Sequence, residues 1–79
     1  MEKSQLESTL RRIFSEVFNV PESHIEQQTK QHDLEGWDSL GQLRLVMAIE
    51  EQLNISFQME AIAQLDTFLK IVDYCGAAE

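Results

Sequence analysis

The residues whose types could do nucleophilic chemistry are Ser39, Asp38 just before it, and His32 a few positions upstream. A serine attacks a carbonyl group only when a base lies within hydrogen-bond reach, a third group orients that base, and an oxyanion hole lies in a water-poor pocket. The spacing of these three residues does not indicate such an arrangement, and Asp38 is better suited to capping a helix. A chain of 79 residues is also too short to enclose such a pocket. The sequence therefore argues against a hydrolase.

No set of residues has the spacing of a metal or nucleotide site. His24, His32 and Cys75 are scattered and lack the paired spacing of metal ligands. We expect both histidines to be solvated loop residues and Cys75 to be a small core hydrophobe. A glycine-rich phosphate loop is absent from the sequence. We therefore expect no metal site and no nucleotide site.

Ser39 is a candidate for a different reason, because it stands at the expected start of a helix after a long loop. An Asp-Ser pair is common in helix capping, so the pair alone does not indicate a function. However, the unpaired backbone N–H groups and the positive end of the helix dipole favour a phosphate group at such a place. A phosphodiester on the Ser39 hydroxyl would be stabilised there. The apolar residues Leu40, Leu43 and Met47 would lie close by for a partner to contact.

The elements that position Ser39 are expected to be helices. Apolar residues at helical spacing predict a first helix over about residues 5–18. We expect it to begin with a capping box of Ser4 and Glu7 and to end at Asn19 and Pro21. The second helix is expected to start at Asp38, its N-cap, after a turn allowed by Gly36, and to run to about residue 53.

The second helix carries more apolar surface than one contact needs. Its apolar residues cover an arc of about 220°, whereas a surface helix needs a stripe of about 100°. The surplus lies at Leu40, Leu43 and Met47. Either this helix is central and packs against two neighbours, or the surplus edge is a docking surface beside Ser39.

The remaining chain predicts one long loop and two further helices. Residues 19–37 show no sustained period. Residues 21–23 are expected to open a single helical turn that carries Ile25, and Leu34 and Trp37 are expected to anchor the loop. A short third helix is expected over residues 58–64. Asp66 and Thr67 are expected to cap a fourth helix, which Gly76 would end. Residues 77–79 would then form a frayed tail. The expected fold is an all-α, small four-helix bundle of one domain, residues 1–79, with three main helices and a short one.

The charge and composition limit the partners. Six Lys and Arg residues stand against 14 Asp and Glu residues, for a net charge of −8. This balance argues against nucleic acid and anionic membranes and favours basic protein surfaces. The longest apolar run, residues 45–49, is far too short to span a membrane, and the polar start does not suit a signal peptide. A single cysteine favours a reducing compartment, so we expect a cytoplasmic location.

Residues 33–40, with the sequence Asp-Leu-Glu-Gly-Trp-Asp-Ser-Leu, and residues 43–51, with Leu-Arg-Leu-Val-Met-Ala-Ile-Glu-Glu, closely resemble the acyl carrier protein family. The whole chain fits the family in its length, its order of helices and the place of Asp-Ser-Leu at the head of the second helix. The Asp-Ser-Leu motif alone is weak, but the motif with both flanking segments is specific.

The resemblance implies a phosphoprotein and not an enzyme. A phosphopantetheinyl transferase would move 4′-phosphopantetheine from coenzyme A onto Ser39, and the thiol of that arm would carry acyl groups as thioesters between partner enzymes. By the same resemblance, Asp38 would help to engage the transferase, and partner enzymes with basic docking surfaces would hold the second helix. The implied partner-binding residues are Asp38, Leu40, Leu43, Arg44, Met47, Glu50 and Glu51. The implied lining of a pliable acyl pocket is Val46, Ile49, Phe57, Ile62 and Leu65.

The chain departs from the family at two positions. Fatty-acid carriers tend to place acidic residues where this chain has Gly41 and Arg44, and the net charge of residues 38–53 is only −2. Gly41 also lowers helix propensity by about 0.5–1 kcal/mol, which predicts a mobile first turn. We therefore expect a dedicated polyketide, unusual lipid or other specialised acyl pathway rather than bulk fatty-acid biosynthesis.

Two alternatives remain at this point. One is an aminoacyl or peptidyl carrier, which has the same arm and bundle but is loaded by an adenylating enzyme. The other is an unmodified helical interaction module in which Ser39 is only a capping residue. The sequence is expected to form a monomer, although an exposed apolar edge could also self-associate.

Overall fold

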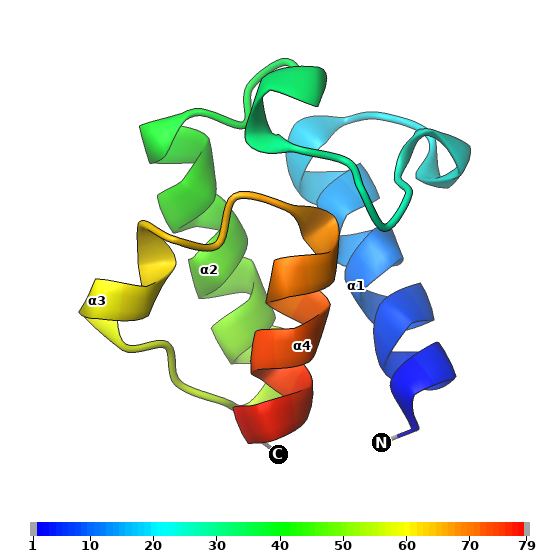
Figure 1. The fold of residues 1–79 in the computed structure, drawn as a ribbon. Helices are drawn as coiled ribbons and strands as arrows, with labels where there is room; N and C mark the ends of the chain where they lie inside the picture. The colour runs from blue at the N-terminus through cyan, green and yellow to red at the C-terminus, as the bar shows by residue number, and fades with distance from the viewer. Residues whose placement is uncertain (1, 79) are drawn as a thin grey trace.

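The structure, a computed structural model that describes residues 2–78, consists of helices and connecting loops and has no β-strand in that range. The four α-helices are α1 (Lys3–Phe18), α2 (Ser39–Leu53), α3 (Met59–Ile62) and α4 (Phe68–Ala78). Two short 3-10 turns, Glu22–His24 and Gln31–Asp33, interrupt the loop between α1 and α2. In Figure 1 this loop covers one end of the bundle, and α3 lies to the side of α2 and α4. The predicted all-α bundle with a long first loop is confirmed.

The core forms where the apolar faces of α1, α2 and α4 meet. The Phe14 ring of α1 lies at its centre, fully buried, in edge-to-face contact with Trp37 at 5.0 Å and with Phe68 at 5.1 Å between ring centroids. Such aromatic pairs are favourable beyond the apolar area that they bury. The buried residues that α1 contributes are Leu6, Leu10, Ile13, Phe14 and Phe18.

The long loop is fixed in place by both apolar anchors and hydrogen bonds. Its predicted anchors Leu34 and Trp37 are both buried, which confirms the expectation, and Ile25 is buried as well. Its backbone also bonds to the start of α4, because the Phe68 N–H donates to the Thr29 carbonyl at 2.9 Å. Because the loop is attached to α4 in this way, it delivers the chain to the start of α2 along a defined path.

The first helix begins earlier than predicted. Its N-cap is Glu2, in extended conformation and without a side-chain capping bond, so Ser4 lies inside α1 and the predicted capping box is wrong. Glu7 instead pairs with Arg11 one turn later at 3.0 Å, an arrangement that stabilises helices. The predicted end is confirmed, because Phe18 is the last helical residue and Asn19 follows with φ of 56°.

The third and fourth helices also differ from their predicted bounds. Helix α3 has only four residues, because the chain turns after Ile62, where the Leu65 N–H donates to the Ile62 carbonyl at 3.3 Å. The predicted cap of α4 is confirmed at Thr67, whose hydroxyl accepts from the Lys70 N–H at 3.1 Å.

The prediction that Gly76 ends α4 is wrong. The helix continues through two alanines, which are strong helix formers, to Ala78. Gly76 is therefore an internal helical residue that faces Leu6 of α1. Of the predicted frayed tail, residues 77 and 78 are helical, and Glu79 lies outside the described residues.

Candidate functional site

Ser39 is the first residue of α2, as predicted, and its side chain is exposed. The preceding Asp38 is the N-cap: its Oδ1 accepts a hydrogen bond from the Gly41 N–H at 2.8 Å. This bond uses one of the unpaired N–H groups that begin every helix. The Ser39 hydroxyl thus projects from the positive end of a 15-residue helix, where a negatively charged phosphodiester is electrostatically favoured.

The loop approaches α2 closely at two glycines, Gly36 and Gly41. Gly36 has φ of +91°, a conformation that glycine adopts without strain. Its carbonyl oxygen lies against Gly41 of α2, so that a Cβ at position 41 would overlap it and would also lie 3.1 Å from Cε1 of Phe18. Gly41 is buried in this contact, which argues against the mobile first turn that we expected from its low helix propensity.

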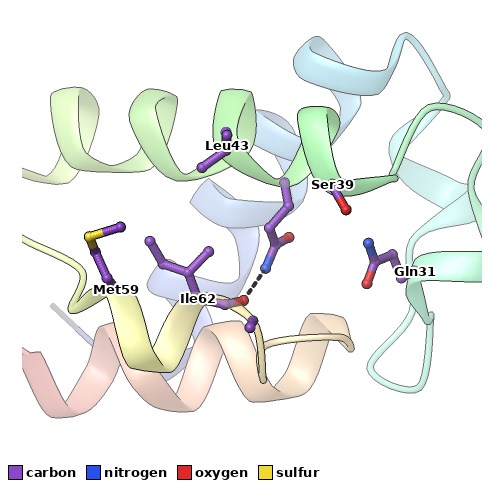
Figure 2. Close-up of a pocket in the computed structure, with 7 residues that line it drawn as sticks. Gln31, Ser39, Leu43, Met59 and Ile62 are labelled. Atoms are coloured by element: carbon purple, nitrogen blue, oxygen red, sulfur yellow. Dashed lines mark hydrogen bonds between the residues drawn. The ribbon is translucent and has the colours of Figure 1, made fainter.

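An open groove between α2 and α3 leads away from Ser39. Figure 2 shows Leu43 on α2 facing Met59 and Ile62 on α3, while Ser39 and Gln31 lie at one end of the space. The groove has a volume of about 360 Å³. It is lined by Gln31, Ser39, Gln42, Leu43, Met59, Ile62 and Ala63.

Gln42, one helical turn after Ser39, is a site residue that the sequence analysis missed. Its side chain is only 6% exposed. Its Oε1 accepts from the indole N–H of Trp37 at 2.7 Å, and its Nε2 donates to the carbonyls of Ile62 at 2.8 Å and Leu65 at 3.0 Å. A signal for its burial was present, since position 42 falls on the helical stripe that continues through the buried residues 45, 46 and 49.

Most of the predicted partner-binding residues lie along one exposed edge of α2, and Asp38 directly precedes the helix. Leu40, Leu43 and Met47 are 68%, 52% and 67% exposed, so the surplus apolar arc is not explained by packing against a second neighbour. Arg44 and Glu51 are exposed on the same helix. Glu50 is different, because it is half-buried and its carboxylate accepts a hydrogen bond from the Phe57 N–H at 2.9 Å.

The predicted acyl-pocket residues are divided between the groove and the core. Ile62 lines the groove beside Ser39. The other four are buried members of the hydrophobic core: Val46, Ile49, Phe57 and Leu65. The groove at Ser39 and the core beneath it are therefore separate spaces in this structure, and Gln42 lies between them.

The remaining candidate residues occupy ordinary positions. His24 and His32 are exposed loop residues, and Cys75 is fully buried in the core, as expected. Within residues 2–78, no three side chains of His, Cys, Asp or Glu are grouped closely enough to hold a metal ion. The described helices also include none that is long and apolar enough to cross a membrane.

Comparisons with known proteins agree with this geometry. The family model described as "Phosphopantetheine attachment site" matches residues 8–75, which is most of the chain. The chain is 36% identical over 70 residues to "Acyl carrier protein 3" of Ralstonia nicotianae, covering 87% of this chain and 79% of that protein. It is also 36% identical over 75 residues to "Acyl carrier protein" of Cyanidioschyzon merolae, covering 94% and 81% of the two chains.

The match to an attachment-site family fits the exposed serine at the head of α2, the favourable end of the helix dipole and the open groove beside it. Proteins of this kind work with a phosphopantetheinyl transferase and with the enzymes of an acyl pathway. The chain belongs to the phosphopantetheine-binding acyl carrier protein family, and it is a carrier with 4′-phosphopantetheine as its covalent cofactor rather than a catalyst.

Proposed function

We propose that the Ser39 hydroxyl is the attachment point of the phosphopantetheine arm and that the arm holds acyl groups as thioesters for partner enzymes. One observation carries this proposal: Ser39 is an exposed hydroxyl at the first position of α2, capped by Asp38 and open to the groove. The N–H groups at this helix start would face the new phosphodiester and stabilise its charge. We further propose that residues 1–79 form one carrier domain.

Partner enzymes would dock on the exposed edge of α2. Leu40, Leu43 and Met47 give this edge its apolar contact area, and at such exposure they contribute little to the core. Asp38 and Glu51 add negative charge at its two ends. This arrangement, with the net charge of −8, favours partners that present basic surfaces around an apolar patch.

Glu50 also belongs to the predicted acidic set, and it has a structural role as well. Its carboxylate accepts a hydrogen bond from the Phe57 N–H at 2.9 Å, so the charged group is positioned next to the segment that leads to α3. Arg44 supplies the opposite sign in the middle of the same edge. We propose that this cation helps to select partners.

The pathway that best fits these positions is a specialised one, such as a polyketide or unusual lipid route, in the cytoplasm. Fatty-acid carriers tend to have acidic residues at the positions of Gly41 and Arg44. No acidic side chain fits at position 41, because even a Cβ would overlap the Gly36 carbonyl. The cytoplasm is proposed because a single cysteine allows no disulfide within the chain. A monomer is proposed as the carrying form.

Intact-mass measurement tests the attachment point. The protein is incubated with coenzyme A and a broad-specificity phosphopantetheinyl transferase, and the mass of one arm is expected on the wild type and on Ser23→Ala. Ser23 is a suitable control because it is an exposed serine in a 3-10 turn of the long loop. The Ser39→Ala variant is expected to gain no mass. Unmodified wild type, or full modification of Ser39→Ala, would overturn the proposal.

Loading assays test the kind of cargo. The arm-bearing protein is offered to acyl-transferring enzymes and, separately, to adenylating enzymes with their amino acids. Acyl loading alone is expected. Aminoacyl loading alone would assign the chain to peptidyl carriers, and efficient elongation by ordinary fatty-acid enzymes would contradict a specialised pathway.

A further inference from the structure

Gln42 holds together three segments of the chain directly beneath the groove at Ser39. Its amide oxygen is bonded to Trp37, the last buried anchor of the long loop. Both amide hydrogens are bonded to carbonyls of the chain that leaves α3, at Ile62 and Leu65. In Figure 2 a dashed line marks the bond that reaches the backbone at Ile62 from α2.

These bonds matter because they hold the end of α3. The chain before α3 is held by the bonds of the Phe57 N–H to Glu50 and of the Gln58 N–H to Tyr74. Helix α3 is four residues long and has no buried residue of its own. Met59 is 84% exposed, and Ile62 is only half-buried. A helix of this length is not stable by itself, so its position depends on contacts with the rest of the molecule. Gln42 supplies two of these contacts from the middle of the space between the helices.

An acyl chain that folds back from the end of the arm into this groove meets the Gln42 side chain before it reaches the core. The groove walls are apolar at Leu43, Met59 and Ile62, but between them and the core lies the amide of Gln42. A long alkyl chain could reach the core only by separating α3 from α2. That movement would break the two bonds from Nε2 and leave buried polar groups without partners, which is costly. A short acyl group could lie in the groove with these bonds intact.

We propose that Gln42 is a specificity-determining residue that closes the core to long alkyl chains, so that this carrier favours short acyl groups held in the surface groove. The proposal rests on the attachment of the arm at Ser39. It concerns where the cargo lies and which cargo is favoured.

The experiment compares butyryl and dodecanoyl forms of the protein. A promiscuous transferase loads each acyl-pantetheine arm from the matching acyl-coenzyme A, and the products are compared with the arm alone. On the wild type, amide chemical shifts are expected to change with the acyl group only around the groove, at residues such as Gln31 and Ala63. The core amides of Ile49 and Leu65 are expected to stay unchanged. Cleavage of both thioesters by hydroxylamine is expected at similar rates.

The Gln42→Met variant removes the amide and keeps a side chain of similar length. In this variant the dodecanoyl chain is expected to shift the core amides and to slow thioester cleavage several-fold. Gln52→Met makes the same chemical change at an exposed position of α2 and is expected to behave like the wild type. Core shifts with dodecanoyl on the wild type, or no difference between Gln42→Met and Gln52→Met, would overturn the proposal.

The outcomes separate this inference from the attachment at Ser39. A wild-type protein that takes up no arm refutes the attachment, and does so before any acyl group is compared. If Gln42→Met fails to give the dispersed amide spectrum of a folded protein, the amide spectra of the wild type alone test the proposal. Unchanged core amides in its dodecanoyl form then support the closed core, and shifted core amides overturn it.

Discussion

The close approach of the long loop to α2 predicts that Gly41→Ala destabilises the protein, although alanine is the better helix former. In an unconstrained helix interior the substitution would stabilise by about 0.5–1 kcal/mol. At position 41, however, the new methyl group would overlap the carbonyl oxygen of Gly36 and crowd Phe18 at 3.1 Å. A backbone carbonyl cannot rotate away as a flexible side chain can, so the loop or the start of α2 must shift.

The expected magnitude follows from these two opposing effects. Overfilling a packed site costs about 1–3 kcal/mol, and a clash with backbone belongs at the upper end of that range. Subtracting the gain in helix propensity leaves a net loss of about 2 kcal/mol in the free energy of unfolding. For a domain of this size, such a loss lowers the midpoint of thermal unfolding by about 8–16 °C.

The matched control is Gly76→Ala in α4. A Cβ there would make only an ordinary contact with Leu6, at 3.7 Å from Cδ2. This variant is expected to gain the helix propensity in full, about 0.5–1 kcal/mol. Both variants are measured by thermal and urea unfolding, followed by circular dichroism. If Gly41→Ala proved as stabilising as Gly76→Ala, the close contact at Gly36 would be refuted, and the mobile first turn predicted from sequence would be restored.

Three further predictions concern the hydrogen bond between Trp37 and Gln42, the cap at Asp38 and the exposed ion pair of Lys70. Trp37→Phe leaves Oε1 of Gln42 buried without its 2.7 Å partner and should cost about 1–3 kcal/mol in urea unfolding. Asp38→Ala should cost about 1 kcal/mol, whereas Asp38→Asn, which keeps a capping oxygen, should cost clearly less; equal losses would contradict the capping role. The hydrogen bond from Lys70, with its charge, lowers the pKa of Asp66. This pair therefore stabilises the fold above the unfolded pKa of Asp66, and its effect is lost as the pH falls through the folded pKa. Lys70→Gln should raise the pKa of Asp66 in an NMR titration and lose stability at neutral pH but not in strong acid.

The main helices could be predicted because their signals are local and redundant. In α2, the capping Asp38, the turn at Gly36 and the apolar period all agree with one another, and the bounds were correct. At the start of α1 the local signals compete. Glu7 can bond back to Ser4 in a capping box or forward to Arg11, and the forward ion pair with a longer helix is what forms. Nothing in the local sequence ranks these two options.

The site was only partly predictable, because half of it depends on contacts between distant segments. The place of Ser39 follows from local capping chemistry. The roles of Gly41 and Gln42 depend on Gly36, Trp37 and the turn after α3, which lie elsewhere in the chain. From the sequence alone, a glycine in a helix indicates only a lower helix propensity, because the backbone segment that approaches it is not known. Likewise, a glutamine on an apolar stripe is predicted to be a surface residue when its hydrogen-bond partners are not known.

Arg44, the cation on α2, differs from most basic residues of this chain in its lack of an ion pair within residues 2–78. Of the six basic residues, four pair with carboxylates of this chain, namely Lys3 with Asp73, Arg11 with Glu7, Arg12 with Glu16 and Lys70 with Asp66. Over residues 2–78, Lys30 and Arg44 have no ion pair. Lys30 lies in the long loop, whereas Arg44 lies among the exposed apolar residues Leu43 and Met47. A partner with a uniformly basic surface would meet repulsion at this point, and one with an acidic group there would be favoured. We infer that Arg44 selects partners chiefly by rejecting those that fit a uniformly acidic second helix.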